Sequence, residues 1–348
     1  MSNYLRKCLF RMSSSIVFLW AMYLYSHNAR KRSLRSLAFD RMMRLLGLRR
    51  WLGVMGRYRD KTMRLLKRRT DDERMTGVWR IGVRGQKDWI GHMPVHSWQL
   101  PTSRHHRCIL YLHGGGYVMG ATPFHYDFIH DMLKGSQSDI VYPVYFKAPH
   151  HHYQDAIQPL IECYRDIISD YGPENVTVMG DSAGGGLAMS LLMTLRDQGI
   201  VMPKHLILIS PWLDMVMNSV DYEEYDRRDP FLNRLAMQQI GQYWAGNIPE
   251  ISDYRLSPIN GDLEGLPPIY CVAGTYDLLC VDTQKLETKM QMIGHPHLVR
   301  YGEKMNHIYP ILPVYESLFI RQEICDIIIG NKKIVSKERN YGKNLYKS

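Results

Sequence analysis

Cysteine is scarce in this chain, and the residues present form no disulfide framework. Six cysteines are scattered through 348 residues: Cys8, Cys108, Cys163, Cys271, Cys280 and Cys325. Small secreted domains instead carry close-set, paired cysteines that compensate for a small core. The pattern excludes that class and favours a reducing, cytoplasmic setting with free thiols.

Metal-binding spacings are lacking as well. The chain has fifteen histidines, and the most suggestive are His105, His106 and the triplet from His150 to His152. None of them has the Cys/His pairing or the H-E-x-x-H spacing that holds zinc. We therefore expect no metal and no cofactor.

Long hydrophobic runs are also lacking. The apolar run from Ile16 to Tyr25 has about ten residues, whereas a helix needs roughly 20 to span a bilayer. Basic residues flank it on both sides. Its length suits a signal-peptide core, but no A-x-A-like cleavage site follows. Whether residues 1–30 are a signal, an anchor or part of a cap stays open.

Acidic residues are almost absent from residues 1–70. This arm holds 18 Lys or Arg residues but only Asp40 and Asp60, a net charge of +16 in a chain of +10. From Leu34 to about Leu66 it is basic and imperfectly amphipathic, because Arg41 falls at an apolar position. The arm either lies on an anionic membrane surface or forms cap helices with a solvated basic face. No nucleic-acid module accompanies it, so no nucleic-acid partner is expected.

The most informative motif is the run from Gly180 to Gly185, which has Ser182 at its centre. An apolar strand-like stretch precedes it, and a helix-like stretch from Leu187 to Leu195 follows. A G-x-S-x-G turn between a strand and a helix is the nucleophile elbow of α/β-hydrolases. The small neighbours allow the strained backbone of such a turn, and the helix directs its N-terminal N–H groups at the site.

A second glycine motif, His113-Gly114-Gly115-Gly116, follows the apolar run from Cys108 to Leu112. An HGGG loop after a strand supplies oxyanion-hole N–H groups in lipases and esterases. Glycines let the backbone approach a substrate carbonyl closely. We expect the N–H groups of Gly114, Gly115 and Ala183 to hold the developing negative charge.

An acid and a base follow in the order that this chemistry needs. Asp277 comes after the strand-like run from Ile269 to Val272, and His307 comes after another from His297 to Tyr301. His307 would take the proton of Ser182, and Asp277 would orient the imidazole. Two other aspartates are rivals for the acid role, Asp282 and Asp262.

These motifs together resemble the hormone-sensitive-lipase-like, or type IV, carboxylesterases over about residues 105–325. Further matching stretches are Ser210-Pro211-Trp212-Leu213-Asp214, Leu256-Ser257-Pro258 and Leu266-Pro267-Pro268. The resemblance implies an α/β-hydrolase fold with a helical cap, and cofactor-free ester hydrolysis by Ser182, Asp277 and His307. Two positions depart from the family pattern: His150 replaces a glutamate, and Lys304 replaces a glycine.

The periodicity also favours an α/β fold with a mostly parallel central sheet and helices on both faces. Apolar runs at Ile140–Tyr145, Val176–Met179 and Leu206–Ile209 alternate with helical patterns, such as that of Asp155–Tyr171. We expect one catalytic domain over residues 71–330, an arm at 1–70 and a basic tail at 331–348.

The segment at about 218–262 interrupts the strand order, and we expect it to belong to the cap. Candidate pocket residues are Tyr117, Phe231, Met237, Tyr243 and Trp244. Simple packing between cap and core explains each of them about as well.

The sequence therefore predicts a serine carboxylesterase for short- to medium-chain esters. An amidase or a longer-chain lipase could use the same residues, and a non-catalytic small-molecule-binding protein is the alternative from another class. Expected partners are the ester substrate and an anionic membrane surface, which would make a cytoplasmic protein peripherally membrane-associated. Whether the protein forms a homodimer stays open.

Overall fold

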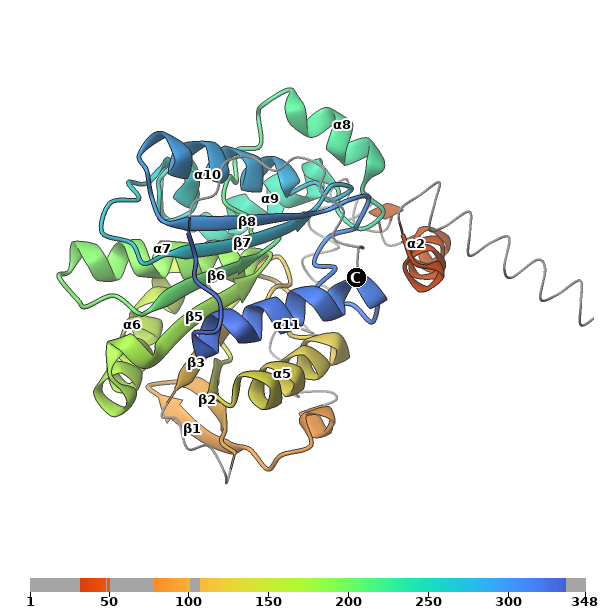
Figure 1. Ribbon diagram of the computed structural model, residues 1–348. Coiled ribbons are helices and arrows are strands. Elements are labelled where there is room, and N and C mark those ends of the chain that lie inside the picture. The colour runs from red at the N-terminus through yellow and green to blue at the C-terminus, as the bar shows by residue number, and fades with distance from the viewer. Residues whose placement is uncertain (1–31, 48, 51–77, 101–106, 336–348) are drawn as a thin grey trace, which may run out of the picture.

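An eight-stranded sheet forms the centre of the computed structural model, which describes residues 32–47, 49–50, 78–100 and 107–335 (Figure 1). The strand order is β1-β2-β4-β3-β5-β6-β7-β8. The strands are β1 (Gln86–Ile90), β2 (Met93–Trp98), β3 (Cys108–Leu112), β4 (Asp139–Pro143), β5 (Val176–Asp181), β6 (His205–Ile209), β7 (Ile269–Gly274) and β8 (His297–Gly302). Neighbours from β4 to β8 are parallel, and β2 pairs antiparallel with both β1 and β4.

The predicted α/β fold with a mostly parallel sheet is therefore confirmed. All six strands predicted from apolar runs form, with ends that differ by up to two residues. β1 and β2 were not predicted, because Gln86–Ile90 is largely exposed and neither strand carries a continuous apolar run. The chain order reverses between β3 and β5, and a site in an open parallel sheet falls at the carboxyl ends of the strands beside such a reversal.

Helices cover both faces of the sheet. α6 (Tyr153–Tyr171), α7 (Ala183–Asp197) and α10 (Cys280–Met292) pack in one apolar core, and α5 (Pro123–Ser136) and α11 (Tyr315–Ile329) pack in the other (Figure 1). The apolar face predicted for the helix at Asp155–Tyr171 is buried against the first core, and this helix begins two residues earlier than predicted.

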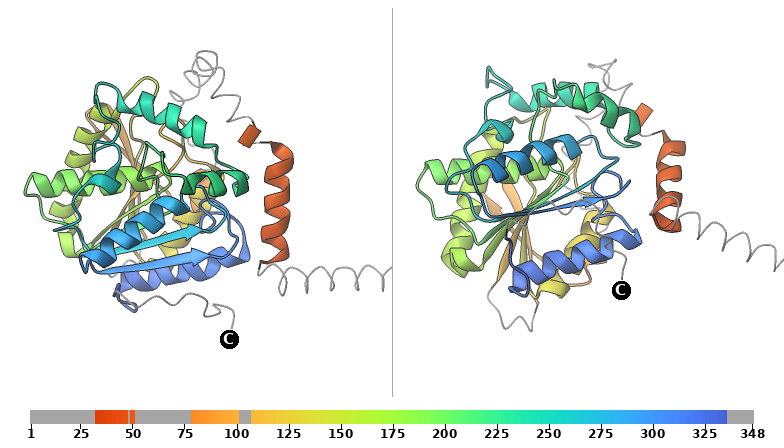
Figure 2. Two further views of the ribbon diagram at one scale, coloured as in Figure 1. Left: turned by 90° about the horizontal axis from the view of Figure 1, so that it is seen from above. Right: turned by 45° about the horizontal axis from the view of Figure 1, so that its top comes forward.

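Two further helices, α8 (Asp221–Arg228) and α9 (Arg234–Ala245), occupy the segment predicted to be the cap. α2 (Leu34–Leu46) lies at the side of the molecule, between these helices and α11 (Figure 2). Within the described residues, no helix combines the length and the apolar character that a bilayer span needs. The rest of the predicted arm at 1–70, and the tail beyond residue 335, fall outside the described residues.

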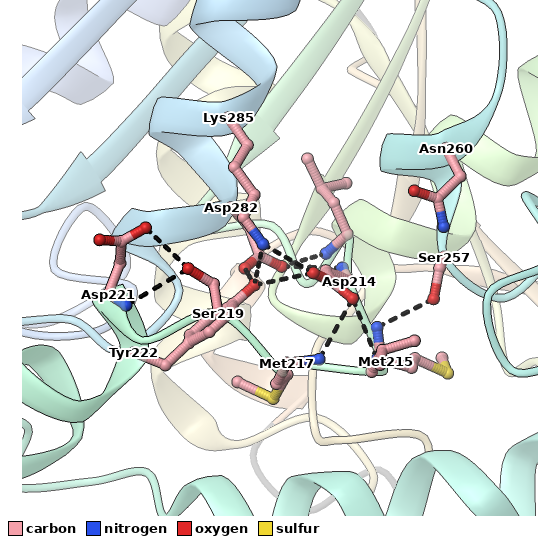
Figure 3. A network of polar contacts seen from close by, with 12 residues as sticks. Asp214, Met215, Met217, Ser219, Asp221, Tyr222, Ser257, Asn260, Asp282 and Lys285 are labelled. Atoms are coloured by element: carbon pink, nitrogen blue, oxygen red, sulfur yellow. Dashed lines mark hydrogen bonds and ion pairs between the residues drawn. The ribbon is translucent and has the colours of Figure 1, made fainter.

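A buried polar network ties α8 to the body of the protein (Figure 3). The Asp282 carboxylate on α10 accepts hydrogen bonds from the N–H groups of Leu213 and Asp214, at 2.6 and 2.9 Å, and from the Tyr222 hydroxyl of α8, at 2.6 Å. Lys285 Nζ donates to Asp214 at 2.7 Å. Burial raises the pKa of Asp282 to about 7.

The same network joins two stretches that the family resemblance singled out. The N–H of Met215 donates to Ser257 Oγ at 2.9 Å (Figure 3). The N–H of Ile259 donates to the carbonyl of Leu213 at 3.2 Å. These bonds fix the loop after β6, which runs beside the end of β5. The two stretches are thus parts of one scaffold under the cap.

Removing the Tyr222 hydroxyl should weaken this attachment. We predict that Tyr222→Phe lowers the free energy of unfolding by about 1–3 kcal/mol, because a buried Asp282 oxygen loses its donor. Urea denaturation measures the change. Tyr225→Phe on the same helix is the matched control, since its hydroxyl bonds the exposed Gln284. Equal free energies of unfolding for the two variants would show that the Tyr222–Asp282 hydrogen bond does not stabilise the protein.

Candidate active site

Ser182 stands at the junction of β5 and α7, in a backbone conformation that few side chains adopt. Its φ is 53° and its ψ is −123°, a region in which a residue with a Cβ is strained. The glycines around it allow the tight turn: a Cβ on Gly184 would lie 2.1 Å from the carbonyl oxygen of Leu112. The turn therefore depends on the small residues that the sequence places around the serine.

This conformation directs the serine hydroxyl away from the helix that it precedes. Ser182 is the N-cap of α7, where a serine side chain ordinarily accepts an N–H of the first turn. It makes no such bond, and its Oγ lies 2.9 Å from His307 Nε2. The N–H of Ala183 donates no hydrogen bond among the described residues. This N–H and the positive end of the helix dipole are thus available to an anion.

His307 brings Ser182 and Asp277 into one array. Its Nδ1 lies 3.0 Å from both carboxylate oxygens of Asp277, which is fully buried. A carboxylate there requires the proton on Nδ1, so Nε2 is the acceptor for the serine hydroxyl. The three residues come from the loops after β5, β7 and β8. The structure therefore assembles the array that the sequence predicted.

Backbone bonds hold the acid loop against the histidine loop. The N–H of Tyr276 donates to the carbonyl of Met305 at 2.9 Å, and the N–H of Lys304 donates to Thr275 Oγ1 at 2.6 Å. Lys304 has a φ of 57°, the left-handed conformation that glycine adopts without strain. The departure from the family glycine is thus accommodated at the cost of local strain, and His307 keeps its place.

The two rival aspartates are placed elsewhere. Asp282 is committed to the network below the cap, as described above. Asp262 is exposed, and its carboxylate accepts the N–H of Glu264 in a turn. Asp277 is therefore the acid that contacts the imidazole.

Carboxylates around His307 make the imidazole more basic. Burial alone would lower the pKa of His307, but the charge and hydrogen bond of Asp277, and the charges of Asp229 and Asp181, outweigh it and raise the pKa. A proton on this histidine is thus stabilised, as a general base requires.

Asp229 is one of two aspartates that the sequence analysis did not identify as part of the site. It comes from the cap, between α8 and α9, yet its fully buried carboxylate accepts the N–H of Leu278, the residue after Asp277, at 2.7 Å. Burial, and next the charge of Asp277, raise the pKa of Asp229 to about 7. Arg49 fixes the turn that carries it, through the carbonyl of Leu232 and the carboxylate of Asp226.

Asp181, the other missed aspartate, corrects one predicted oxyanion donor. The N–H of Gly114 donates to Asp181 Oδ1 at 3.0 Å, so it is not available to a substrate. The N–H groups of Gly115 and Gly116 donate no hydrogen bond among the described residues, and these glycines have φ values of 124° and 61°. The geometry thus leaves Gly115 and Ala183 as predicted donors and replaces Gly114 with Gly116.

Three hydrogen-bonding groups surround the buried Asp181 carboxylate. Besides Gly114, Tyr111 donates its hydroxyl at 2.6 Å, and His125 Nε2 lies at 3.2 Å. His125 Nδ1 accepts the N–H of Thr122 at 3.0 Å, so the proton of a neutral His125 is on Nε2 and points at Asp181. Burial opposes the charge, but His125 and Tyr111 outweigh burial and lower the pKa of Asp181.

His113, the first residue of the HGGG motif, has a structural place behind the glycines. Its ring stacks on Tyr145 at a centroid distance of 4.7 Å, and its carbonyl accepts the Tyr145 hydroxyl at 2.7 Å. Burial, and next the charge of Lys147, lower the pKa of His113 to about 3, so the ring is neutral. His113 therefore orients the loop and does not serve as a second base.

The five candidate pocket residues make different packing contacts. Tyr117 and Trp244 are buried and stack at a centroid distance of 4.4 Å in the core, and Met237 is buried nearby. Tyr243 is half-buried, with its carbonyl against His152. Phe231 stacks on Phe39 of α2. Their contact with a substrate stays a prediction, because burial gives Tyr117 and Trp244 a packing role.

Fold and site together define a class of protein: a hydrolase with a serine on an elbow and a histidine–carboxylate pair beside it. The family model described as the α/β hydrolase fold matches residues 109–311. The chain therefore belongs to the α/β-hydrolase family, and the resemblance to its hormone-sensitive-lipase-like esterases is confirmed. It is a hydrolase of the esterase type.

Particular relatives agree with this class. LipR of Mycobacterium tuberculosis, named as an acetyl-hydrolase, is 35% identical over 211 residues, which cover 60% of this chain and 67% of that protein. An acetyl-hydrolase of Streptomyces hygroscopicus is 30% identical over 230 residues, covering 64% and 76%. A crystal structure of an esterase from the bacterial hormone-sensitive lipase family superimposes with a TM-score of 0.67 at 26% identity, covering 75% and 91%.

Replacing Asp181 should affect both the oxyanion loop and the base. We predict that Asp181→Asn lowers kcat for 4-nitrophenyl acetate about 10- to 100-fold with little change in KM, because an amide oxygen holds the Gly114 N–H more weakly than a carboxylate does and the amide NH2 would face His125 Nε2. The acid limb of the kcat/KM profile should also move to lower pH. His307 must be neutral to act, and removing a nearby negative charge lowers its raised pKa.

Asp262→Asn is the control for this measurement, because it removes a charge of the same sign from an exposed loop. It should leave the profile unchanged. A purely structural role for Asp181 would reduce activity without moving the acid limb, and that result would contradict the electrostatic assignment.

Proposed function

We propose that this protein is a serine carboxylesterase that removes short acyl groups, acetyl above all, through an acyl-enzyme intermediate. The observation that carries the proposal is the Ser182–His307–Asp277 array, with its two distances of 2.9 and 3.0 Å at the carboxyl ends of the strands. The names of the two acetyl-hydrolase relatives support the acetyl group as the substrate class.

In the first half of the reaction, Ser182 Oγ attacks the ester carbonyl while its proton passes to His307 Nε2. The negative charge that develops on the carbonyl oxygen is held by the N–H groups of Gly115, Gly116 and Ala183. Asp277 stabilises the imidazolium, which then gives its proton to the departing alcohol. The product of this half is an ester between the acyl group and Ser182.

The second half repeats these steps with water. His307 takes a proton from the water molecule, whose oxygen attacks the acyl carbon, and the same N–H groups hold the second oxyanion. Collapse of this intermediate releases the acid, and the proton returns from His307 to Ser182 Oγ.

A small-molecule-binding role without catalysis is not favoured by the geometry. In a receptor on this scaffold the histidine is free to be lost, whereas here His307 keeps hydrogen-bond contact with both partners. The strained backbone of Ser182 also lowers the stability of the fold, and a protein that only binds a ligand gains nothing from it.

Replacing the proposed nucleophile tests the function. We predict that Ser182→Ala lowers kcat on 4-nitrophenyl acetate by about 10⁴- to 10⁶-fold, with the fold retained by circular dichroism. The same assay with esters from acetate to decanoate measures acyl preference, and the rate should be highest at the short chains.

Ser136→Ala is a suitable control and should turn over like the wild type, because Ser136 is a buried serine of α5 whose hydroxyl donates to the carbonyl of Met132, outside the array. Turnover by Ser182→Ala within tenfold of the wild type would exclude the mechanism. A folded wild-type protein that hydrolyses no ester of any chain length would favour an amidase or a binding role.

A further inference from the structure

Exposed apolar side chains gather on two neighbouring helices. Fifteen large apolar side chains are exposed among the described residues, and six of them belong to α2 and the beginning of α11. Those on α2 are Met42, Leu45 and Leu46, with exposed fractions of 43%, 84% and 69%. Such a concentration differs from the single exposed apolar residues that any surface carries.

The residues on α11 extend the same surface. Tyr315, Leu318 and Phe319 are exposed and follow the three- and four-residue spacing that puts side chains on one side of a helix. Arg35 of α2 lies over the Tyr315 ring at 5.6 Å, and Ser33 at the start of α2 donates to the Glu316 carboxylate. The two helices are therefore in contact at their N-terminal ends, and Met42, Leu45 and Leu46 lie farther along α2, toward the cap. We call these six apolar residues with Arg35 and Arg41 the α2–α11 surface.

The charge on this surface has one sign. Arg35 and Arg41 are exposed on the outward side of α2, among the apolar residues, and Arg44 is exposed beside them. The acidic groups nearby are engaged: Asp40 pairs with Arg44, and Glu316 is buried against Ser33. The sequence adds that residues 1–70 carry 18 basic residues and only two acidic ones.

We propose that the α2–α11 surface binds an anionic lipid membrane. Leucine, methionine and aromatic side chains can enter the boundary between headgroups and acyl chains, while arginines beside them meet anionic headgroups. Each basic residue near such a surface contributes about 1 kcal/mol of attraction. The surface thus has both components that peripheral membrane binding requires.

A second copy of this chain fits the surface less well. A twofold interface would bury this patch against itself, and because the patch holds no carboxylate, the arginines of either copy would meet no opposite charge. A nucleic acid would leave the six apolar side chains without a partner. Anionic lipid satisfies both the charge and the apolar area.

The inward side of α2 contacts both the cap segment and the loop that carries His307. Phe39 stacks on Phe231 of the cap segment at a centroid distance of 6.2 Å, and Ser36 contacts Met305 of the histidine loop. Arg44 donates to the carbonyl of Arg228 at the end of α8. Figure 2 shows α2 running from α11 to the cap. Binding through α2 would hold this side of the cap against the lipid surface.

Vesicle co-sedimentation with the full chain tests the proposal. The probes are phosphatidylcholine vesicles, alone or with about one quarter phosphatidylglycerol, at low salt and at about 0.5 M salt. We expect the wild type to bind the anionic vesicles and to be released by salt. The double variant Leu45→Asp/Leu46→Asp should bind at least about tenfold more weakly, because two charges replace inserted apolar groups.

Two further variants make the result specific. Arg35→Gln/Arg41→Gln should weaken binding to anionic vesicles roughly fivefold per arginine removed and leave binding to neutral vesicles unchanged. Met292→Asp/Ile293→Asp is the matched control, because it changes an adjacent exposed apolar pair at the C-terminal end of α10, which belongs to neither α2 nor α11. It should bind like the wild type.

Three outcomes would overturn the proposal. The first is equal vesicle binding by Leu45→Asp/Leu46→Asp and the wild type, which would assign binding to other residues. The second is no wild-type binding to anionic vesicles; a dimer that Leu45→Asp/Leu46→Asp dissociates in size-exclusion chromatography would then assign the surface to a second copy. The third is binding of the wild type to RNA and not to anionic vesicles. Turnover of soluble 4-nitrophenyl acetate should be unchanged in all variants, so a failure here is separate from a failure of the esterase proposal.

Discussion

The sharp turn between β5 and α7 is the constraint on which the rest of the structure depends. The chain must reverse from strand to helix within one residue, and that residue is a serine with a positive φ. A Cβ on Gly184 or Gly186 would lie 2.1 Å from a backbone oxygen of a neighbouring segment, so the turn and the loops around it are packed backbone against backbone. This close packing fixes the positions of the segments around the turn. It therefore brings the serine hydroxyl, the N-terminus of α7 and the glycine loop together at one point.

The carboxylates around the turn form a second layer of the same design. Asp181 holds the glycine loop from below, Asp277 holds the imidazole, and Asp229 reaches in from the cap to the backbone beside Asp277. Their charges make His307 more basic than burial alone would allow. The cap is thus part of the electrostatics of the site, and Arg49 connects it to the segment that follows α2.

The sequence predicted the central fold and the array well, for physical reasons. Parallel strands buried on both faces are short apolar runs, and a serine, an aspartate and a histidine that follow such runs must meet at one edge of the sheet. The hydrogen-bond partner of Gly114 could not be predicted in this way. A glycine motif says that the backbone comes close to something, but not which N–H is already bonded, and Asp181 takes the first one. Asp229, β1 and β2 were missed because a carboxylate in a cap loop has no periodic signal, β1 is an exposed edge strand, and polar residues and a proline interrupt β2.

Chemical trapping of the nucleophile tests the central claim most directly. A fluorophosphonate reacts with an activated serine and leaves a stable adduct that peptide mass spectrometry can assign. The account predicts one adduct per chain, on Ser182, and its loss when His307 is replaced by alanine, because the hydroxyl is activated by that imidazole. An adduct on a different serine, or no adduct on a folded and hydrolytically active protein, would contradict the account.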